Sequence, residues 1–497
     1  MIESTPTAHG DGNIAVRLDA LLDALDADAT LEAAGPFLRM AAACFSDTRA
    51  GEGPVSTALG RREIAARFDE PLPMGMRSLD DVAARLDRDV LRDANHLLHP
   101  MYLGHQVSAP LAAAVWSEVV ISALNNSMAV WEMSPTATVL EERVIGWMTQ
   151  LVGWGAPAAG TMTSGGTEAT FTALLAARAA WKPDAWEHGW GDGPAPVVLC
   201  GAHAHYAVQR AVGAMGLGTA NCLKVPSDGY RMSPTALGMM LDELAAAGRP
   251  ILAVVATVGQ TATGAFDDLE AIGGLCAARG LWLHVDGAHG ATALLSPAHR
   301  HRVRGIHLAR SVAWDPHKMM LLPLSAGMVL VRDGRDLSAA FAQQAPYLFH
   351  AGESAAPDLG TRSFQCSRRA DVVKLWVALQ RLGADGIGAL YDHLCGLART
   401  LYAMLAADPV RFEVLHAPES NILCFRVRGS DEANLRVREA FNRSGRGWIT
   451  TTVLDGRRVL RVTVMNPRTG EAELRALVDG LAGLAASMCT TASEGGA

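Results

Sequence analysis

A lysine beside a histidine, just after a predicted strand, is the first group in this sequence that could do covalent chemistry. Lys318 follows Pro316 and His317, directly after the apolar run Ser311–Trp314. A lysine in apolar surroundings is expected to have a lowered pKa, and its neutral amine is a nucleophile. Taken alone, a lysine in an ordinary surface loop would look the same, so Lys318 needs partners before it defines a site.

An aspartate and a segment of small residues could complete a binding site around this lysine. Asp286 ends the apolar run Leu281–Val285, and a carboxylate at the carboxyl end of a parallel strand points into the ligand crevice. A buried carboxylate there needs a cationic partner, such as a protonated ring nitrogen, and a simple helix cap is the alternative. The segment Thr161–Thr170 opens an Ala-rich helix with small residues and hydroxyls. Its free N–H groups could bind a phosphate, or they could form an ordinary capped turn.

His205 supplies a fourth group, because it follows the predicted strand Val197–Cys200. An imidazole at that position could stack on a flat aromatic ligand. A metal site shared with His203 is disfavoured, since no acidic residue stands nearby at ligand spacing, and we predict no metal. A phosphate cradle, a stacking imidazole, a carboxylate and a nucleophilic lysine are together the parts that hold pyridoxal 5'-phosphate. The sequence therefore predicts this cofactor.

The same motifs resemble those of the group II pyridoxal-phosphate-dependent amino acid decarboxylases. This family includes glutamate, cysteine sulfinate, 2,4-diaminobutyrate and aromatic amino acid decarboxylases. The resemblance runs from about His99 to Pro467, and the motifs that carry it are His99-Pro100, Thr163–Thr167, His205-Tyr206, Leu281–Asp286 and Pro316–Lys318. It implies the α/β fold of fold type I (aspartate aminotransferase-like) and a homodimer with its active sites at the subunit interface.

The resemblance implies a role for individual residues around the cofactor. Lys318 corresponds to the lysine that binds the cofactor covalently, Asp286 to the partner of the pyridine nitrogen, and His205 to the histidine stacked on the ring. The other cofactor contacts that it implies are Gly166, Thr167, Thr257, Ala288 and His317.

Three further residues correspond to groups that act on the substrate. Tyr347, in a loop over 345–360 that resembles a flexible lid, corresponds to the tyrosine that protonates the substrate Cα, so the implied catalytic residues are Lys318, His205 and Tyr347. Arg461 corresponds to the arginine that binds a substrate carboxylate. His105 stands where glutamate decarboxylases have glutamine and diaminobutyrate decarboxylases have histidine, so we expect it to contact the substrate.

Several positions depart from the family pattern. Asp315 replaces the asparagine of glutamate decarboxylases, His289 stands where an aromatic residue is frequent, and Gln260 replaces a threonine. His105 favours a diaminobutyrate decarboxylase, whereas Tyr347-Leu348-Phe349 is more similar to glutamate or cysteine sulfinate decarboxylases. The residues Gln260, Gly287 and His289 hint at a specialised branch of the family.

The expected activity is therefore α-decarboxylation of an L-amino acid to the amine and carbon dioxide. We expect a polar aliphatic substrate, with an acidic one such as glutamate, aspartate or cysteine sulfinate favoured, 2,4-diaminobutyrate second and an aromatic amino acid third. The nearest alternative is decarboxylation coupled to oxidative deamination, which gives an aldehyde, and Tyr347 argues against it. A non-catalytic cofactor-binding scaffold is more distant, since it would not need Lys318, Asp286 and His205 together.

Composition excludes several other classes of protein. The 497 residues carry 43 basic and 51 acidic side chains, a net charge of −8, which disfavours nucleic acid or an anionic membrane as a partner. A hydrophobic content of 49% excludes disorder for most of the chain. The eight cysteines include no CxxC pair, which fits free thiols in a reducing cytoplasm. We see neither a secretory pattern at residues 1–13 nor an apolar run of about 18 residues.

The elements that must position these groups divide the chain into three parts. Residues 1–95 are expected to form a helical arm, 96–385 a large cofactor-binding domain and 386–497 a small α+β domain. The strands expected in the large domain are Val197–Cys200, Ile251–Val258, Leu281–Val285, Ser311–Trp314 and Gly327–Val331, with helices such as Ala169–Trp181 and Leu269–Arg279 between them. Apolar strands alternating with helices predict a mostly parallel sheet covered on both faces. The strands expected in the small domain are Phe412–Leu415, Ile422–Val427 and Val459–Val464.

The arm is expected to be amphipathic. Leu18, Leu21, Leu22 and Leu25 recur with helical spacing, and Gly35-Pro36 is expected to interrupt the helix. A second helical stretch is expected over Asp80–Asn95. Such an arm needs another body against which to bury its apolar face, and a second subunit would serve.

Overall fold

The computed structural model describes residues 11–341 and 358–494. A seven-stranded sheet forms its centre, in the order β1 (Ala159–Thr163), β9 (Gly327–Val331), β8 (Ser311–Trp314), β7 (Trp282–Asp286), β6 (Ile251–Thr257), β2 (Val197–Gly201) and β3 (Cys222–Val225). Only β9 runs antiparallel to both of its neighbours, and the pairs from β8 to β3 are all parallel. The predicted fold class, a mostly parallel sheet between helices, is confirmed.

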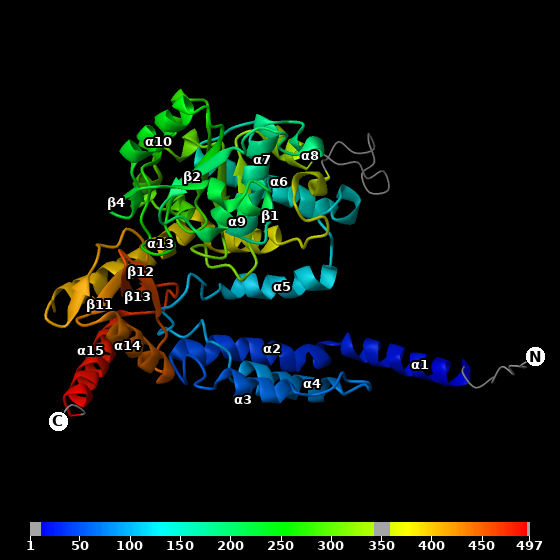
Figure 1. Ribbon diagram of the computed structural model, residues 1–497. Helices are drawn as coiled ribbons and strands as arrows, with labels where there is room; N and C mark the ends of the chain where they lie inside the picture. Colours follow the sequence, from blue (N-terminus) through cyan, green and yellow to red (C-terminus); the bar gives the residue numbers. More distant parts are fainter. Residues whose placement is uncertain (1–10, 342–357, 495–497) are drawn as a thin grey trace, which may run out of the picture.

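Helices cover both faces of this sheet (Figure 1). One face packs against α7 (Gly166–Trp181), α9 (Tyr206–Ala214) and α12 (Gly334–Ala340). The other packs against α6 (Pro135–Val152), α11 (Leu269–Ala278) and the first part of α13 (Val372–Ala406). Two further helices, α8 (Ala185–His188) and α10 (Pro234–Ala246), lie at its periphery. The strands β2, β7, β8 and β9 are buried along their whole length, as expected for a sheet covered on both sides.

A smaller antiparallel sheet follows, in the order β10 (Phe412–Val414), β11 (Ile422–Val427), β13 (Arg457–Thr463) and β12 (Thr450–Leu454). The helices α14 (Asp431–Arg443) and α15 (Glu471–Glu494) pack with it. The long helix α13 joins the two sheets and bends at Gly383, whose φ of 68° lies in the left-handed region that glycine tolerates. No helix among the described residues is long and apolar enough to cross a membrane.

The arm consists of α1 (Asp11–Asp28), α2 (Leu31–Ser46), the short α3 (Arg61–Ala65) and α4 (Leu79–Leu86), which continues as a π-helical turn over Asp87–Leu91. Figure 1 shows these helices apart from the α/β body, with α5 (Ala112–Leu124) beside them. The expected break at Gly35-Pro36 is wrong. The chain breaks instead before α2, because the Thr30 side chain accepts the N–H of Ala33 and caps the new helix. Pro36 lies inside α2, where it removes one helical hydrogen bond without ending the helix.

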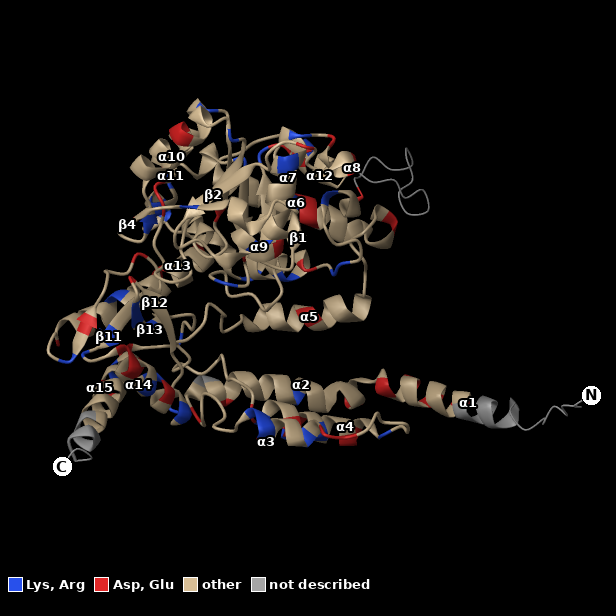
Figure 2. Cartoon of the chain, in the orientation of Figure 1, with Lys and Arg blue, Asp and Glu red and all other residues tan. Residues whose placement is uncertain are grey.

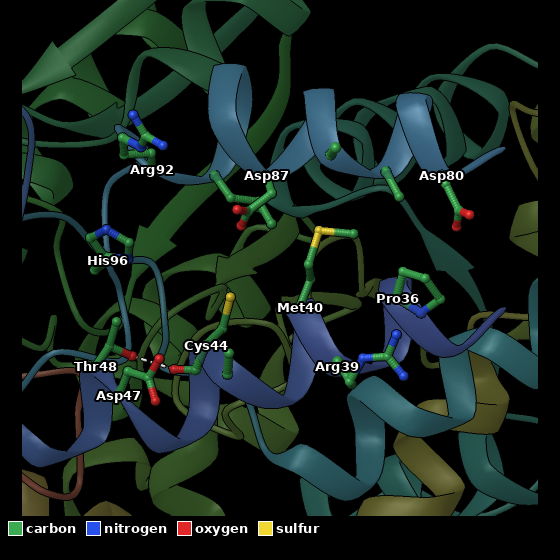
Figure 3. Close-up of a pocket in the computed structure, with 14 residues that line it drawn as sticks. Pro36, Arg39, Met40, Cys44, Asp47, Thr48, Asp80, Asp87, Arg92 and His96 are labelled. Atoms are coloured by element: carbon green, nitrogen blue, oxygen red, sulfur yellow. Dashed lines mark hydrogen bonds between the residues drawn. The ribbon is translucent and has the colours of Figure 1, made fainter. Parts of the chain in front are cut away.

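A hollow of about 590 Å³ lies between α2 and α4. In Figure 3, Arg39, Met40 and Cys44 on α2 face Asp80 and Asp87 across it. None of the residues predicted to do chemistry lines this hollow.

Candidate active site

The residues predicted to hold the cofactor come together at the carboxyl ends of the parallel strands. A cavity of about 360 Å³ lies there, in the place where open α/β sheets bind ligands. Its lining includes all eight of them, Gly166, Thr167, His205, Thr257, Asp286, Ala288, His317 and Lys318. Each belongs to an end or a connection of the sheet, namely the start of α7, the cap of α9, the ends of β6 and β7, and the turn after β8. The sheet itself thus assembles the site.

Lys318 lies in a turn that is fixed from two sides. The Ser108 hydroxyl lies 3.0 Å from the carbonyl oxygen of His317 and 3.1 Å from that of Leu322. The Ala326 N–H donates to His317 Nδ1 at 3.0 Å. Lys318 Nζ lies 3.2 Å from Asp315 Oδ2. The amine is therefore held in the cavity by a buried carboxylate.

Asp286 is a buried carboxylate at the end of β7. Its Oδ1 accepts the N–H of Ala288 at 3.2 Å. Burial raises its pKa, and the charges of Lys318 and His205 offset only part of that rise. A cationic hydrogen-bond donor stabilises the ionised form of such a buried carboxylate, and a protonated pyridine nitrogen is a donor of this kind.

The start of α7 forms an open cradle beside these groups. The side chain of Glu168 accepts the N–H and the hydroxyl of Ser164, at 2.9 and 2.6 Å, and so shapes the turn before the helix. A Cβ on Gly166 would lie 2.9 Å from Ala288 Cβ and 3.0 Å from Asp315 Oδ2. Only glycine leaves this space free, and backbone N–H groups at a helix N-terminus suit a phosphate.

His205 and Thr257 complete the cavity wall. His205 Nδ1 accepts the N–H of Ala207 at 3.2 Å, and burial lowers the pKa of this imidazole. Thr257 Oγ1 is buried without a hydrogen-bond partner among the described residues. A free hydroxyl, a buried carboxylate, a glycine cradle and a reachable lysine are the features that pyridoxal phosphate needs, so the residues present fit this cofactor.

The two predicted substrate-binding residues lie together, outside the lining of this cavity. Arg461, on β13, is buried and donates from Nε to the carbonyl oxygen of Ala262 at 3.1 Å, next to the cavity residue Thr261. One of its terminal nitrogens has no hydrogen-bond partner among the described residues. His105 reaches the surface, yet partial burial and the charges of Arg461 and Arg438 lower its pKa. Thr450 Oγ1 lies 3.5 Å from the carbonyl oxygen of Gly104 and 3.5 Å from a terminal nitrogen of Arg461, so the segment that carries His105 approaches Arg461.

The third predicted substrate-directed residue, Tyr347, lies outside the described residues. Two residues that the sequence singled out only as departures do line the cavity, Asp315 and His289. His289 Nε2 lies 2.7 Å from Asn421 Oδ1, and burial lowers the pKa of this imidazole to about 3. The sequence signal that could have marked both is their position, next to the motifs of Lys318 and Asp286.

Comparison with known proteins decides the family. The family model of the pyridoxal-dependent decarboxylase conserved domain matches residues 66–428. The chain belongs to this family. This decarboxylase is 36% identical over 423 residues to the L-2,4-diaminobutyrate decarboxylase of Rhizobium meliloti, across 83% of each chain. It is 33% identical over 355 residues to human cysteine sulfinic acid decarboxylase, across 70% of this chain and 72% of the relative.

Solved structures agree with this assignment. The crystal structure of mouse CSAD superposes on this decarboxylase with a TM-score of 0.85 and 27% identity, across 95% of this chain and 99% of that one. The protein is therefore a pyridoxal-phosphate-dependent amino acid decarboxylase. Which amino acid it uses, and which residue does what, are separate questions.

Proposed function

We propose that this decarboxylase removes the α-carboxylate of a polar aliphatic L-amino acid, and that an acidic side chain is preferred. The observation that carries the proposal is the buried guanidinium of Arg461, which donates to the carbonyl oxygen of Ala262 and has one terminal nitrogen without a hydrogen-bond partner among the described residues. Partial burial and the charges of Arg461 and Arg438 lower the pKa of His105. A guanidinium suits a carboxylate, a sulfinate or a similar anion. The likeness to a cysteine sulfinic acid decarboxylase supports this preference.

The described residues divide the work of such a reaction. When bound, pyridoxal phosphate supplies a conjugated ring that takes up the electrons left by departing carbon dioxide. Asp286 would hold a proton on the ring nitrogen. Lys318 would hold the cofactor through its amine, and His205 would lie against one face of the ring. Arg461 orients a carboxylate of the substrate.

A 2,4-diaminobutyrate decarboxylase is the second candidate. Its support is the 36% identity to the Rhizobium meliloti relative, together with histidine at position 105. An aromatic substrate ranks third. An aldehyde product remains an alternative outcome, because the residue that argues against it, Tyr347, lies outside the described part of the chain.

A parallel assay distinguishes these substrates. We expect kcat/KM for the best of glutamate, aspartate and cysteine sulfinate to exceed that for 2,4-diaminobutyrate at least about tenfold, or about 1.4 kcal/mol. The Arg461→Met variant removes the cation and is expected to lower kcat/KM for the acidic substrates about 100-fold, because a buried ion pair is lost. A preference for 2,4-diaminobutyrate in the unaltered enzyme would overturn the proposal.

We further propose that two copies form a homodimer through the arm and α5. No residue of the fully described helix α2 is buried. Figure 2 shows few charged residues on α2 and α5, and the one charged residue in α5 is Glu118. Large apolar side chains are exposed on α1 and α5, namely Leu18, Leu21, Leu22, Leu25, Trp116, Val119, Val120 and Leu124. Apolar surface of this extent is typical of an interface between subunits.

A pair of valine substitutions tests the dimer. Val120 on α5 is 54% exposed, and Val410, in the connection after α13, is 84% exposed. We expect the Val120→Asp variant to sediment as a single chain, because a charge in an apolar interface is costly, and the Val410→Asp variant to remain a dimer. A single chain in the unaltered protein, or an unchanged dimer in the Val120→Asp variant, would contradict this surface.

The free thiols of the described cysteines support the further proposal that the enzyme works in a reducing cytoplasm.

A further inference from the structure

Asp315 is a buried carboxylate in the cavity to which the proposed reaction gives no role. It is 1% exposed, and its Oδ1 has no hydrogen-bond partner among the described residues. Its Oδ2 lies 3.2 Å from Lys318 Nζ and 3.4 Å from His317 Nε2. The same oxygen lies 3.0 Å from where a Cβ on Gly166 would be, at the start of α7. Asp315 therefore occupies the edge of the cradle that suits the cofactor phosphate.

A backbone hydrogen bond determines which ring nitrogen of the neighbouring His317 carries the proton. His317 Nδ1 accepts the N–H of Ala326, so this nitrogen uses its lone pair and carries no proton. The proton of the neutral ring is therefore on Nε2, which faces Asp315. A second proton on the ring would break the bond to Ala326.

The charge of Asp315 is balanced mainly by Lys318. Burial by itself would raise the pKa of Asp315, but the Lys318 charge, the hydrogen bond from His317 and the Gly166 N–H together lower it. The carboxylate is therefore ionised. Lys318 is also the amine expected to bond to the cofactor. A phosphate dianion in this cradle would face a carboxylate that has lost its simple ammonium partner.

Two neighbouring acids in one buried site cannot both remain fully ionised. We propose that Asp315 couples cofactor binding to proton uptake, so that the phosphate enters the cradle with one additional proton that Asp315 and the phosphate share. This inference rests on the cofactor assignment made above. The titratable groups around Asp315 come from the turn after β8, the cap of α9 and the end of β7, and they are His205, Asp286, His289, His317 and Lys318.

The proposal fixes the sign of a pH effect. The complex holds one more proton than its separated parts, so affinity for pyridoxal phosphate falls as pH rises, by up to about tenfold per pH unit. Pyridoxal, which lacks the phosphate, can bond to Lys318 but brings no anion to the cradle. It therefore serves as a matched control for every other proton change in the cavity.

Calorimetry in two buffers of different ionisation enthalpy counts these protons. With the cofactor-free full chain near pH 8, we expect about one more proton taken up with pyridoxal phosphate than with pyridoxal. In the Asp315→Asn variant this difference should vanish, and pyridoxal phosphate should bind at least about tenfold tighter than to the unaltered chain. Thermal melting checks that the Asp315→Asn variant folds. The comparison of the two ligands in the unaltered chain tests the proposal even if this variant does not fold.

Each outcome has a distinct meaning. Equal proton uptake for the two ligands in the unaltered chain overturns the role of Asp315 and leaves the cofactor assignment intact. A difference that persists in the Asp315→Asn variant also overturns it, since another group would then hold the proton. Binding of neither ligand overturns the cofactor assignment and this inference together.

Discussion

The Lys318→Ala variant is expected to lose decarboxylation by about four orders of magnitude or more. The amine of Lys318 lies in the cavity beside Asp315, and no other lysine lines that cavity among the described residues. Covalent catalysis needs a nucleophile at that position, and alanine has none. The variant should still bind pyridoxal phosphate non-covalently through the α7 cradle.

Borohydride reduction followed by peptide mass spectrometry checks this prediction directly. The unaltered enzyme should carry the reduced cofactor on the peptide that contains Lys318, and the variant should carry none. The Lys182→Ala variant is the control, because Lys182 pairs with Asp184 near the end of α7, outside the cavity lining. Covalent labelling of another lysine, or turnover by the Lys318→Ala variant, would contradict the assignment.

The Asp286→Ala variant is expected to bind the cofactor and to lose about 10³-fold in kcat. Asp286 is the buried carboxylate at the end of β7, where burial raises its pKa and its ionised form therefore needs a cationic partner. Alanine could not hold a proton on the ring nitrogen, so a bound cofactor would accept electrons poorly at neutral pH. Binding should be weakened far less than turnover, because the cradle and Lys318 remain.

Chemical rescue separates this role from a structural one. A cofactor methylated on the ring nitrogen carries a permanent positive charge, and the methyl group fits where the carboxylate was removed. This methylated cofactor should raise the activity of the Asp286→Ala variant by about tenfold or more, and it should raise the activity of the unaltered enzyme little. The Asp267→Asn variant is the control, since this buried carboxylate bonds to the Thr257 and Met232 N–H groups instead of lining the cavity. Full activity without rescue would refute the role of Asp286.

The sequence predicts the strands that carry the site because they are continuous apolar runs. It does not predict β1 and β12, because Ala159–Thr163 and Thr450–Leu454 are rich in small and polar residues and are fixed as strands only by pairing with β9 and β13. The error at Pro36 has a local cause, since the cap at Thr30 starts α2 ahead of Pro36. Local propensity is overruled wherever tertiary contacts decide the outcome.

Within the site, the strand-end positions of Lys318 and Asp286 became a signal only together with the helix-opening segment Thr161–Thr170 and His205, because either residue alone could be a loop lysine or a helix cap. The approach of Asp315 to Gly166 was not predictable, because it depends on how the turn after β8 folds against the start of α7. The approach of His105 to Arg461 could not be predicted either, because it arises where the segment before α5 packs on the smaller antiparallel sheet. Contacts between distant parts of a chain leave no local pattern.

Mass spectrometry of the products from a mixture of L-amino acids tests the central claim most directly. The enzyme, loaded with pyridoxal phosphate, should convert one polar aliphatic amino acid to the amine that is lighter by one carbon dioxide, and an acidic amino acid should be consumed first. Formation of an aldehyde with hydrogen peroxide, or no product from enzyme that visibly holds its cofactor, would contradict amine-forming decarboxylation of a polar aliphatic amino acid.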